Sequence, residues 1–183
     1  LWDVIGRSPQ TMRKGSDVAG NITRLPGGVA LNIATTLAKF EMIPAILTSV
    51  GYDPDGDELL AACVAQGLII DTVYRSENLP TDRYMAIEGS NGVIAAIADS
   101  HSLEAAGDKI LTPLTDGTIA TISKPYSGLI AIDGNLTTSL LSEITTSFLF
   151  ARADLRVAPA SPGKAKRLLP FIAHSRGTLY VNM

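Results

Sequence analysis

The most informative stretch of this chain lies at residues 26–32, which read Pro26-Gly27-Gly28-Val29-Ala30-Leu31-Asn32. Two adjacent glycines directly before a helical pattern leave the backbone N–H groups of a helix N-terminus unshielded by side chains. Such N–H groups bind hydroxyls or an anion, and Asn32, one turn into the helix, adds an amide that both donates and accepts hydrogen bonds. The alternative is a plain Gly-Gly turn followed by an exposed asparagine, and on these residues alone both interpretations stay open.

The segments around this stretch alternate between helical and strand patterns. Apolar side chains recur on one face of a helix directly after the glycines, at Val29, Ile33, Leu37 and Phe40. Residues 44–50 include a continuous apolar run, which is typical of a strand buried on both faces. An acidic turn at 53–57 then leads into a helix over 58–66, whose N-terminus favours negative charge. This turn lacks the glycine and glutamate of a calcium loop, so we interpret it as a helix start and not as a metal site.

A region of antiparallel character follows. Residues 72–75, 81–88 and 93–99 read as strands, and Asn91-Gly92 between the last two is a strong signal for a tight hairpin. Strands over 128–133, 155–158 and 178–181, with helices over 137–151 and 163–173, then restore the alternating pattern. This order of elements predicts an α/β fold with a mostly parallel sheet.

Composition narrows the class of protein. The chain has 183 residues, of which 46% are hydrophobic, and its formal net charge is −3. These values exclude a disordered chain and give no basic surface for nucleic acid. No apolar run reaches the ~20 residues that span a bilayer. The one cysteine, Cys63, has no partner for an internal disulfide, so we expect a cytoplasmic protein without nucleic-acid or membrane partners.

Polar residues follow two of the predicted strands. Asp133-Gly134-Asn135 comes directly after the strand over 128–133, and Asn182 follows the strand over 178–181. Because ligands of parallel sheets bind beyond the carboxyl ends of strands, Asp133 and Asn135 are candidate site residues. The alternative for them is an ordinary turn that caps the next helix, and both interpretations stay open. Asn182 alone is no signal, since a polar residue after a strand is expected.

Taken together, these segments resemble the ribokinase-like (PfkB-type) carbohydrate kinase family. The resemblance rests on the glycine pair and Asn32 within residues 26–34, on Gly51 after the next strand, and on Asp53-x-x-Gly56. Asp3 matches the aspartate at the end of the family's first strand. Within the family the chain looks most similar to pseudouridine kinases, through Asn91-Gly92, residues 132–135 and Pro159-x-Ser161-x-x-Lys164. Ala158 departs from the pattern, because family members often have Asp or Asn there.

The resemblance implies a fold and a domain organisation. We expect a ribokinase-like three-layer α/β/α fold with a mostly parallel central sheet. A small antiparallel β lid would be formed by about residues 8–24 and 72–99. Residues 1–183 would be the N-terminal part of one such α/β domain, truncated at both ends. The family's C-terminal ATP-binding and catalytic part, including the catalytic aspartate, would be absent and would lie beyond Met183.

The resemblance also implies an activity, the ATP-dependent phosphorylation of a sugar or nucleoside hydroxyl. The implied cofactors are ATP and Mg²⁺, with a monovalent cation as a further candidate. The implied substrate-binding residues are Asp3, Gly27, Gly28, Asn32 and Asn135. The implied ATP-binding residues are Lys164 and Asn182, and Asn182 would also act indirectly on the metal.

Other functions remain as alternatives. The 183-residue piece is expected to be inactive by itself, and a non-catalytic sugar- or nucleoside-binding module on the same scaffold is the rival function. A Gly-x-Gly-Asp motif after Met183 would distinguish the kinase from the binding module. A purely structural or interaction protein is the third class. Because open sheet edges invite pairing, a homodimer through the lid is the expected assembly.

Overall fold

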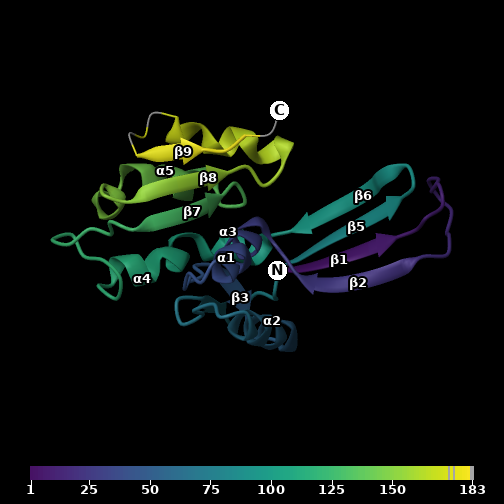
Figure 1. The fold of residues 1–183 in the computed structure, drawn as a ribbon, viewed down its shortest axis with the longest axis horizontal. Coiled ribbons are helices and arrows are strands. Elements are labelled where there is room, and N and C mark those ends of the chain that lie inside the picture. The colour runs from purple at the N-terminus through teal and green to yellow at the C-terminus, as the bar shows by residue number, and fades with distance from the viewer. Residues whose placement is uncertain (173, 175, 182–183) are drawn as a thin grey trace.

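A four-stranded arm and a helix-covered body make up the computed structural model, which describes residues 1–172, 174 and 176–181. The arm has the strand order β2-β1-β5-β6 and consists of β1 (Trp2–Arg7), β2 (Asn21–Pro26), β5 (Arg83–Gly89) and β6 (Gly92–Asp99). β1 pairs antiparallel with β2 and parallel with β5, which pairs antiparallel with β6. Figure 1 shows this sheet, hereafter the lid sheet, projecting from the body.

The part of the body next to the lid sheet contains two helices and a short parallel strand pair. α1 (Val29–Lys39) follows β2, and α2 (Pro54–Ala65) connects β3 (Ser49–Gly51) to the segment before β4 (Tyr74–Ser76). Pro54 stands in the first turn of α2, where its missing N–H group has no partner to lose. One buried cluster joins these elements to the base of the lid sheet and includes Trp2, Leu31, Ala34, Val50, Leu59 and Cys63.

The second part of the body is a parallel sheet in the order β7-β8-β9. Its strands are β7 (Leu129–Asp133), β8 (Asp154–Ala158) and β9 (Gly177–Leu179), and α5 (Thr138–Thr146), η2 (Phe148–Phe150) and the 3₁₀ helix η3 (Pro162–Phe171) lie between them in sequence. Before β7 come α3 (His101–Ala106), η1 (Gly107–Leu111) and α4 (Thr112–Thr115). Leu141, Leu155 and Val157 are 0% exposed, which places the main core here. This is the mixed α/β architecture that the sequence predicts.

The strand expected over 44–50 forms only at its end, as β3. Before β3 the chain makes one isolated bridge, between Ala45 and Ile69, and the Tyr74 N–H group donates to the Thr48 carbonyl at 2.9 Å. The opposite side of this segment faces β7 across a cavity of about 390 Å³ with a mainly aliphatic lining. A strand forms regular ladders only with partners within hydrogen-bond distance, so this segment stays irregular.

The expected lid boundaries also differ from the structure. Residues 8–20 form a loop before β2, and β4 pairs with β3 instead of joining the lid sheet. The hairpin signal is confirmed, because β5 and β6 are joined through Ser90-Asn91 and Gly92 has a φ of +93°. A residue with a side chain would be strained at that φ, which explains the glycine.

Four helices differ from the predictions in their ends or packing. The helix expected over 58–66 is α2 and begins earlier, at Pro54. Phe40, expected on the buried face of α1, is 76% exposed and follows the helix, whereas Leu31 and Ala34 are buried. The helix expected over 137–151 divides at Ser147 into α5 and η2, and the one expected over 163–173 is η3, which contains Pro170. Proline lacks the N–H group that a continuing α-helix needs. None of the described helices is both long and apolar enough to cross a membrane.

Candidate substrate-binding site at the N-terminus of α1

Asp3 and Gly27 touch where the lid sheet meets the body. Asp3 lies on β1, and Gly27 is the buried residue that connects β2 to α1. A Cβ atom at Gly27 would overlap the Asp3 carboxylate. Only glycine therefore lets this carboxylate rest against the backbone at the start of α1.

Gly28 opens α1 and has a φ of +103°, a conformation that residues with side chains rarely adopt. It supplies no side-chain cap to the helix, and a distant residue does so instead. The Ala30 N–H group in the first turn donates to Asp133 Oδ2 at 3.1 Å. Asp133 thus caps α1 from the end of β7, and its buried carboxylate lies at the positive end of the helix dipole.

Asp133 also organises the turn after β7. Its Oδ1 accepts a hydrogen bond from the Asn135 N–H group at 2.7 Å. Both interpretations of Asp133-Gly134-Asn135 were open from sequence, and the structure gives Asp133 a capping role in the folded chain. The cap is for α1, more than a hundred residues away in sequence, rather than for the following helix.

Asn32 lies one turn into α1 and is exposed, close in sequence to the glycine pair. Its backbone N–H group donates to the Gly28 carbonyl at 3.0 Å, as in a regular helix. Its side-chain amide lies on the helix surface. An exposed amide there can both donate to and accept from a hydroxyl.

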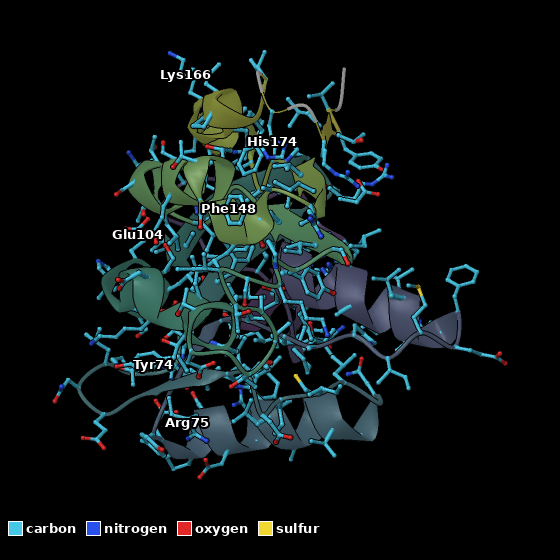
Figure 2. The ribbon with its side chains drawn as sticks, turned by 90° about the vertical axis from the view of Figure 1, so that its left-hand side faces the viewer. Tyr74, Arg75, Glu104, Phe148, Lys166 and His174 are labelled. Carbon is cyan, nitrogen blue, oxygen red and sulfur yellow. The ribbon has the colours of Figure 1, made fainter. Side chains whose placement is uncertain are left out.

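Lys164 and Asn135 meet at the carboxyl ends of β7 and β8. Lys164 Nζ donates to Asn135 Oδ1 at 2.8 Å, and Arg167 Nη1 donates to the Asn135 carbonyl at 3.1 Å. Arg167 also pairs with Glu104 at 3.1 Å. Lys166, in contrast, is exposed and points away from the body in Figure 2. Of the two lysines on η3, Lys164 is therefore the one held beside a candidate site residue.

A polar clamp fixes the base of the lid sheet on α2, on the side opposite Asp3. The Trp2 indole donates to the Asp55 carbonyl at 2.9 Å, and the Arg24 guanidinium lies 3.6 Å from the centroid of the Trp2 ring. Arg24 pairs with Asp55 at 2.8 Å and with Glu58 at 2.7 Å, and Arg83 Nε donates to Asp55 at 3.1 Å. We call Trp2, Arg24, Asp55, Glu58 and Arg83 the lid clamp.

The Gly51…Asp53-x-x-Gly56 pattern has a structural role next to this site. Asp53 accepts hydrogen bonds from the Gly56 N–H group at 2.7 Å, the Thr81 N–H group at 2.6 Å and the Thr81 hydroxyl at 2.7 Å. A Cβ atom at Gly56 would overlap the Gly51 carbonyl. The pattern thus packs the start of α2 against the end of β3 and ties both to the segment leading into β5. This confirms the helix-start interpretation of the acidic turn.

Two carboxyl groups beside the site are perturbed in opposite directions. Burial raises the pKa of Asp3. Burial also acts on Asp53, but the hydrogen bonds from Thr81 and Gly56 outweigh it and lower the pKa of Asp53. Perturbed carboxyl groups are common at functional sites, and Asp3 fits that pattern while Asp53 is a helix cap.

The structure brings the sequence-predicted residues together in two places. Asp3, Gly27, Gly28 and Asn32 lie around the start of α1, and Asn135 and Lys164 lie at the ends of β7 and β8. Asp133 connects the two places through its bonds to Ala30 and Asn135. Asn182 lies outside the described residues. Within the described residues, no group of three or more His, Cys, Asp or Glu side chains is arranged to hold a metal ion.

Comparisons with known proteins identify the family of this chain. The family described as pfkB family carbohydrate kinase matches residues 1–171. The uncharacterized sugar kinase YeiI of Escherichia coli K12 is 28% identical over 173 residues, covering 94% of this chain and 46% of the relative. A pseudouridine kinase of Arabidopsis thaliana is 28% identical over 96 residues, covering 52% of this chain and 25% of the relative.

Solved structures show the same fold. A carbohydrate kinase from Agrobacterium tumefaciens superimposes with a TM-score of 0.72 at 22% identity, over 91% of this chain and 53% of that one. The ribokinase of Arabidopsis thaliana, solved with ribose and ATP, gives a TM-score of 0.67 at 17% identity, over 92% of this chain and 54% of that one. The chain thus has a ribokinase-like fold and spans about half the length of these relatives, and it belongs to the PfkB family of carbohydrate kinases.

Proposed function

We propose that this chain is the substrate-binding part and lid of a kinase that transfers the γ-phosphoryl group of ATP to a hydroxyl of a sugar or nucleoside. The supporting observation is the Asp3 carboxylate seated against the Gly27 backbone at the start of α1, in a chain of the PfkB family. A carboxylate, an exposed amide and a helix N-terminus in one place provide the donors and acceptors that a polyhydroxy ligand needs.

In this proposal the residues at the start of α1 bind and orient the substrate. Asp3 accepts hydrogen bonds from sugar hydroxyls, and Asn32 binds a further hydroxyl. The glycine pair lets the ring approach the backbone. Phosphoryl transfer depends mainly on positioning and charge stabilisation, so orienting the acceptor hydroxyl is itself a catalytic contribution. A site that pairs each hydroxyl also rejects analogues that lack one.

Lys164 fits a role in holding phosphate. Its ammonium group has three donors, and the bond to Asn135 uses one of them, which leaves donors for phosphate oxygens at the strand ends. When bound, ATP supplies the transferred phosphoryl group, with Mg²⁺ and a monovalent cation as the proposed ions. Asn135 orients Lys164 as well as being a proposed substrate residue.

The lid sheet is proposed to exclude water from the substrate, because water would compete as phosphoryl acceptor. The lid clamp holds the base of this sheet against α2, while the other face of the same strands presents Asp3. β1 therefore contributes both to the proposed site, through Asp3, and to the lid clamp, through Trp2.

Pseudouridine kinase activity is our proposed specificity. It is supported by Asn91-Gly92, residues 132–135 and Pro159-x-Ser161-x-x-Lys164, and by the similarity to a pseudouridine kinase. We also propose that the 183-residue piece alone is inactive and that the enzyme is cytoplasmic, which the free, buried thiol of Cys63 supports. Incubation of the piece with ATP, Mg²⁺ and ribosides should give no phosphorylated product, and turnover would overturn the inactivity.

Isothermal titration of the chain with sugars and nucleosides tests the binding role directly. We expect Asn32→Ala to weaken binding at least about tenfold, as loss of a hydrogen bond to a buried ligand does. Thr36→Ala, one turn further along the same helix face, is the matched control and should bind as the parent does. Equal affinities for all three proteins would remove Asn32 from the site.

A homodimer through the lid is part of the proposal. Four apolar side chains lie on the lid-sheet face opposite Asp3 and are 81%, 50%, 40% and 70% exposed: Ile22, Met85, Ile87 and Ile97. A contiguous exposed apolar face favours association. Light scattering should give a dimer mass for the chain and a monomer mass for Ile97→Lys, whereas a monomeric parent chain would contradict the dimer.

A further inference from the structure

Two basic side chains of η3 converge on the turn that follows β7. Lys164 Nζ donates to Asn135 Oδ1 at 2.8 Å, and Arg167 Nη1 donates to the carbonyls of Asn135 at 3.1 Å and Leu136 at 3.3 Å. Residues three apart in a 3₁₀ helix project to the same side, which explains why both side chains reach this turn. Lys166 lies between them in sequence and points away from the body (Figure 2).

The turn itself is fixed on the side of the strands. The Asn135 N–H group donates to Asp133 Oδ1 at 2.7 Å, and the Gly134 N–H group donates to the Ala158 carbonyl at 3.0 Å. Arg167 holds the other side of the turn through its two carbonyl contacts. The Asn135 amide that receives the η3 ammonium therefore projects from a backbone that is held both before and after it.

The two basic groups differ in the charge of their partners. Arg167 Nη1 lies 3.1 Å from Glu104 Oε1, so a carboxylate of α3 offsets the guanidinium charge. α3 is itself anchored, because Asp82 accepts hydrogen bonds from two N–H groups in its first turn at 2.9 Å and 3.0 Å. The Lys164 partner is a neutral amide, so this contact orients the ammonium without neutralising it.

We propose that Arg167, paired with Glu104, is a positioning residue: it holds the Asn135 turn so that Asn135 places the Lys164 ammonium to receive a phosphate oxygen of the phosphoryl donor. This deepens the proposed function and rests on the phosphate role proposed there for Lys164. A lysine ammonium stands on a flexible four-carbon stem, so its position depends on its partner. Ordering it before the donor binds avoids an entropic cost during binding.

Arg167 acts through Lys164 in this proposal, and not by its own contact with phosphate. Its guanidinium is already bonded to two carbonyl groups and one carboxylate. When one residue acts only through another, the effects of removing each are not additive. A double-mutant cycle on Lys164 and Arg167 therefore distinguishes positioning from direct binding.

Calorimetric titration of the 183-residue chain with inorganic tripolyphosphate at low ionic strength tests this inference. We expect Lys164→Met to weaken binding about tenfold or more, and Arg167→Met about threefold or more. Lys166→Met removes the same charge from the same helix and should weaken binding less than about twofold. In the Lys164→Met background, Arg167→Met should cost no more than Lys166→Met does. Melting temperatures establish that each variant is folded.

Glu104→Gln is a second variant, which keeps the contacts of Arg167 with the turn. Removing a negative charge would by electrostatics alone tighten the binding of an anion. Loss of the partner that anchors Arg167 should instead weaken it, by about twofold or more. Glu143→Gln, at an exposed position of α5, is the matched control for the charge and should not weaken binding.

The outcomes separate this inference from the proposed function. If Arg167→Met weakens binding no more than Lys166→Met, if its effect adds fully to that of Lys164→Met, or if Glu104→Gln tightens binding, then the positioning role is wrong while the phosphate role of Lys164 stands. If the parent chain does not bind tripolyphosphate, that phosphate role fails and the inference fails with it. Riboside titration then still tests the substrate-binding site independently.

Discussion

The lid sheet and the β7-β8-β9 sheet are built in opposite ways. In β8, Leu155 and Val157 are 0% exposed, and helices α5 and η3 pack over them. In the lid sheet, every residue of β2 except Pro26 is exposed, and so is most of β6. Burial of apolar surface stabilises the first sheet, whereas backbone pairing and the lid clamp hold the second. The difference indicates that the lid sheet, which we propose to face the substrate, has less packing to restrain it than the β7-β8-β9 sheet has.

The largest effect expected from this contrast is on stability. Leu155→Ala removes a fully buried side chain and should lower the free energy of unfolding by about 2–5 kcal/mol. Ile22→Ala, in the lid sheet, should change it by less than about 0.5 kcal/mol. Urea unfolding at concentrations where the chain is monomeric measures both values. Equal losses would show that the lid sheet is packed as the core sheet is.

Gly27→Ala attacks the junction between the two parts. The new Cβ atom would overlap the Asp3 carboxylate, so that the carboxylate must move from its position against the backbone and the proposed substrate site is distorted. We expect sugar or nucleoside binding to fall at least about tenfold, together with a loss of stability of about 1–3 kcal/mol. Gly6→Ala on β1, the strand that contains Asp3, is the control, since its Cβ would make only ordinary contacts at 3.9 Å. Normal binding by Gly27→Ala would contradict the close approach.

Asp53 caps α2 in the body, next to the lid sheet, and its contribution to stability depends on pH. Its pKa is lowered in the folded state, because hydrogen bonds from Thr81 and Gly56 outweigh the effect of burial. Its contribution to stability is therefore present above about pH 4 and is lost as the pH falls through the lower folded-state pKa. Asp53→Asn should flatten the acid side of a stability-versus-pH curve measured by thermal unfolding. An unchanged acid side would show that the cap is not ionised in the folded chain.

The smallest effect concerns the lid clamp. Asp55→Asn removes the charge that Arg24 and Arg83 share, and partly exposed ion pairs of this kind contribute about 0–1 kcal/mol. Amide hydrogen exchange in β2 and β5 should nevertheless become faster, because the base of the lid sheet is freed from α2. Asp57→Asn is the control, since Asp57 lies on the same helix but pairs with Arg75 of β4. Equal exchange rates in both variants would show that the lid clamp does not restrain the lid sheet.

Local signals in the sequence predicted the starts and turns of elements. The glycine pair before α1, the acidic start of α2 and the Asn91-Gly92 hairpin each depend on neighbours within a few residues. The glycine pair and the hairpin are where the sequence predicts them, whereas α2 begins at Pro54 instead of at residue 58. The prediction of a strand over 44–50 is wrong for the first part of that segment. Strand formation depends on a pairing partner, which the local sequence does not specify.

The candidate site was predictable in its members but not in its connections. Asp133 was recognised after a buried strand, yet its bond to Ala30 joins residues 103 positions apart, and no pattern near either residue indicates it. The lid clamp was missed for the same reason, since Trp2, Arg24, Asp55 and Arg83 come from four different elements. The helix dipole stabilises an acidic residue in the first turn whether or not arginines approach it. Asp55 therefore gave no signal in the sequence that it pairs with Arg24 and Arg83.

Substrate binding by Asp3→Asn tests the central claim most directly. We predict that the variant binds a riboside at least about tenfold more weakly than the parent in a calorimetric titration, because the acceptor of the sugar hydroxyls has lost its charge. Burial raises the pKa of Asp3, so the stability linked to its protonation is present at low pH and is lost as the pH rises through that pKa. The variant should therefore melt at the same or a higher temperature than the parent at neutral pH. Riboside binding as tight as that of the parent would contradict the assignment of this site.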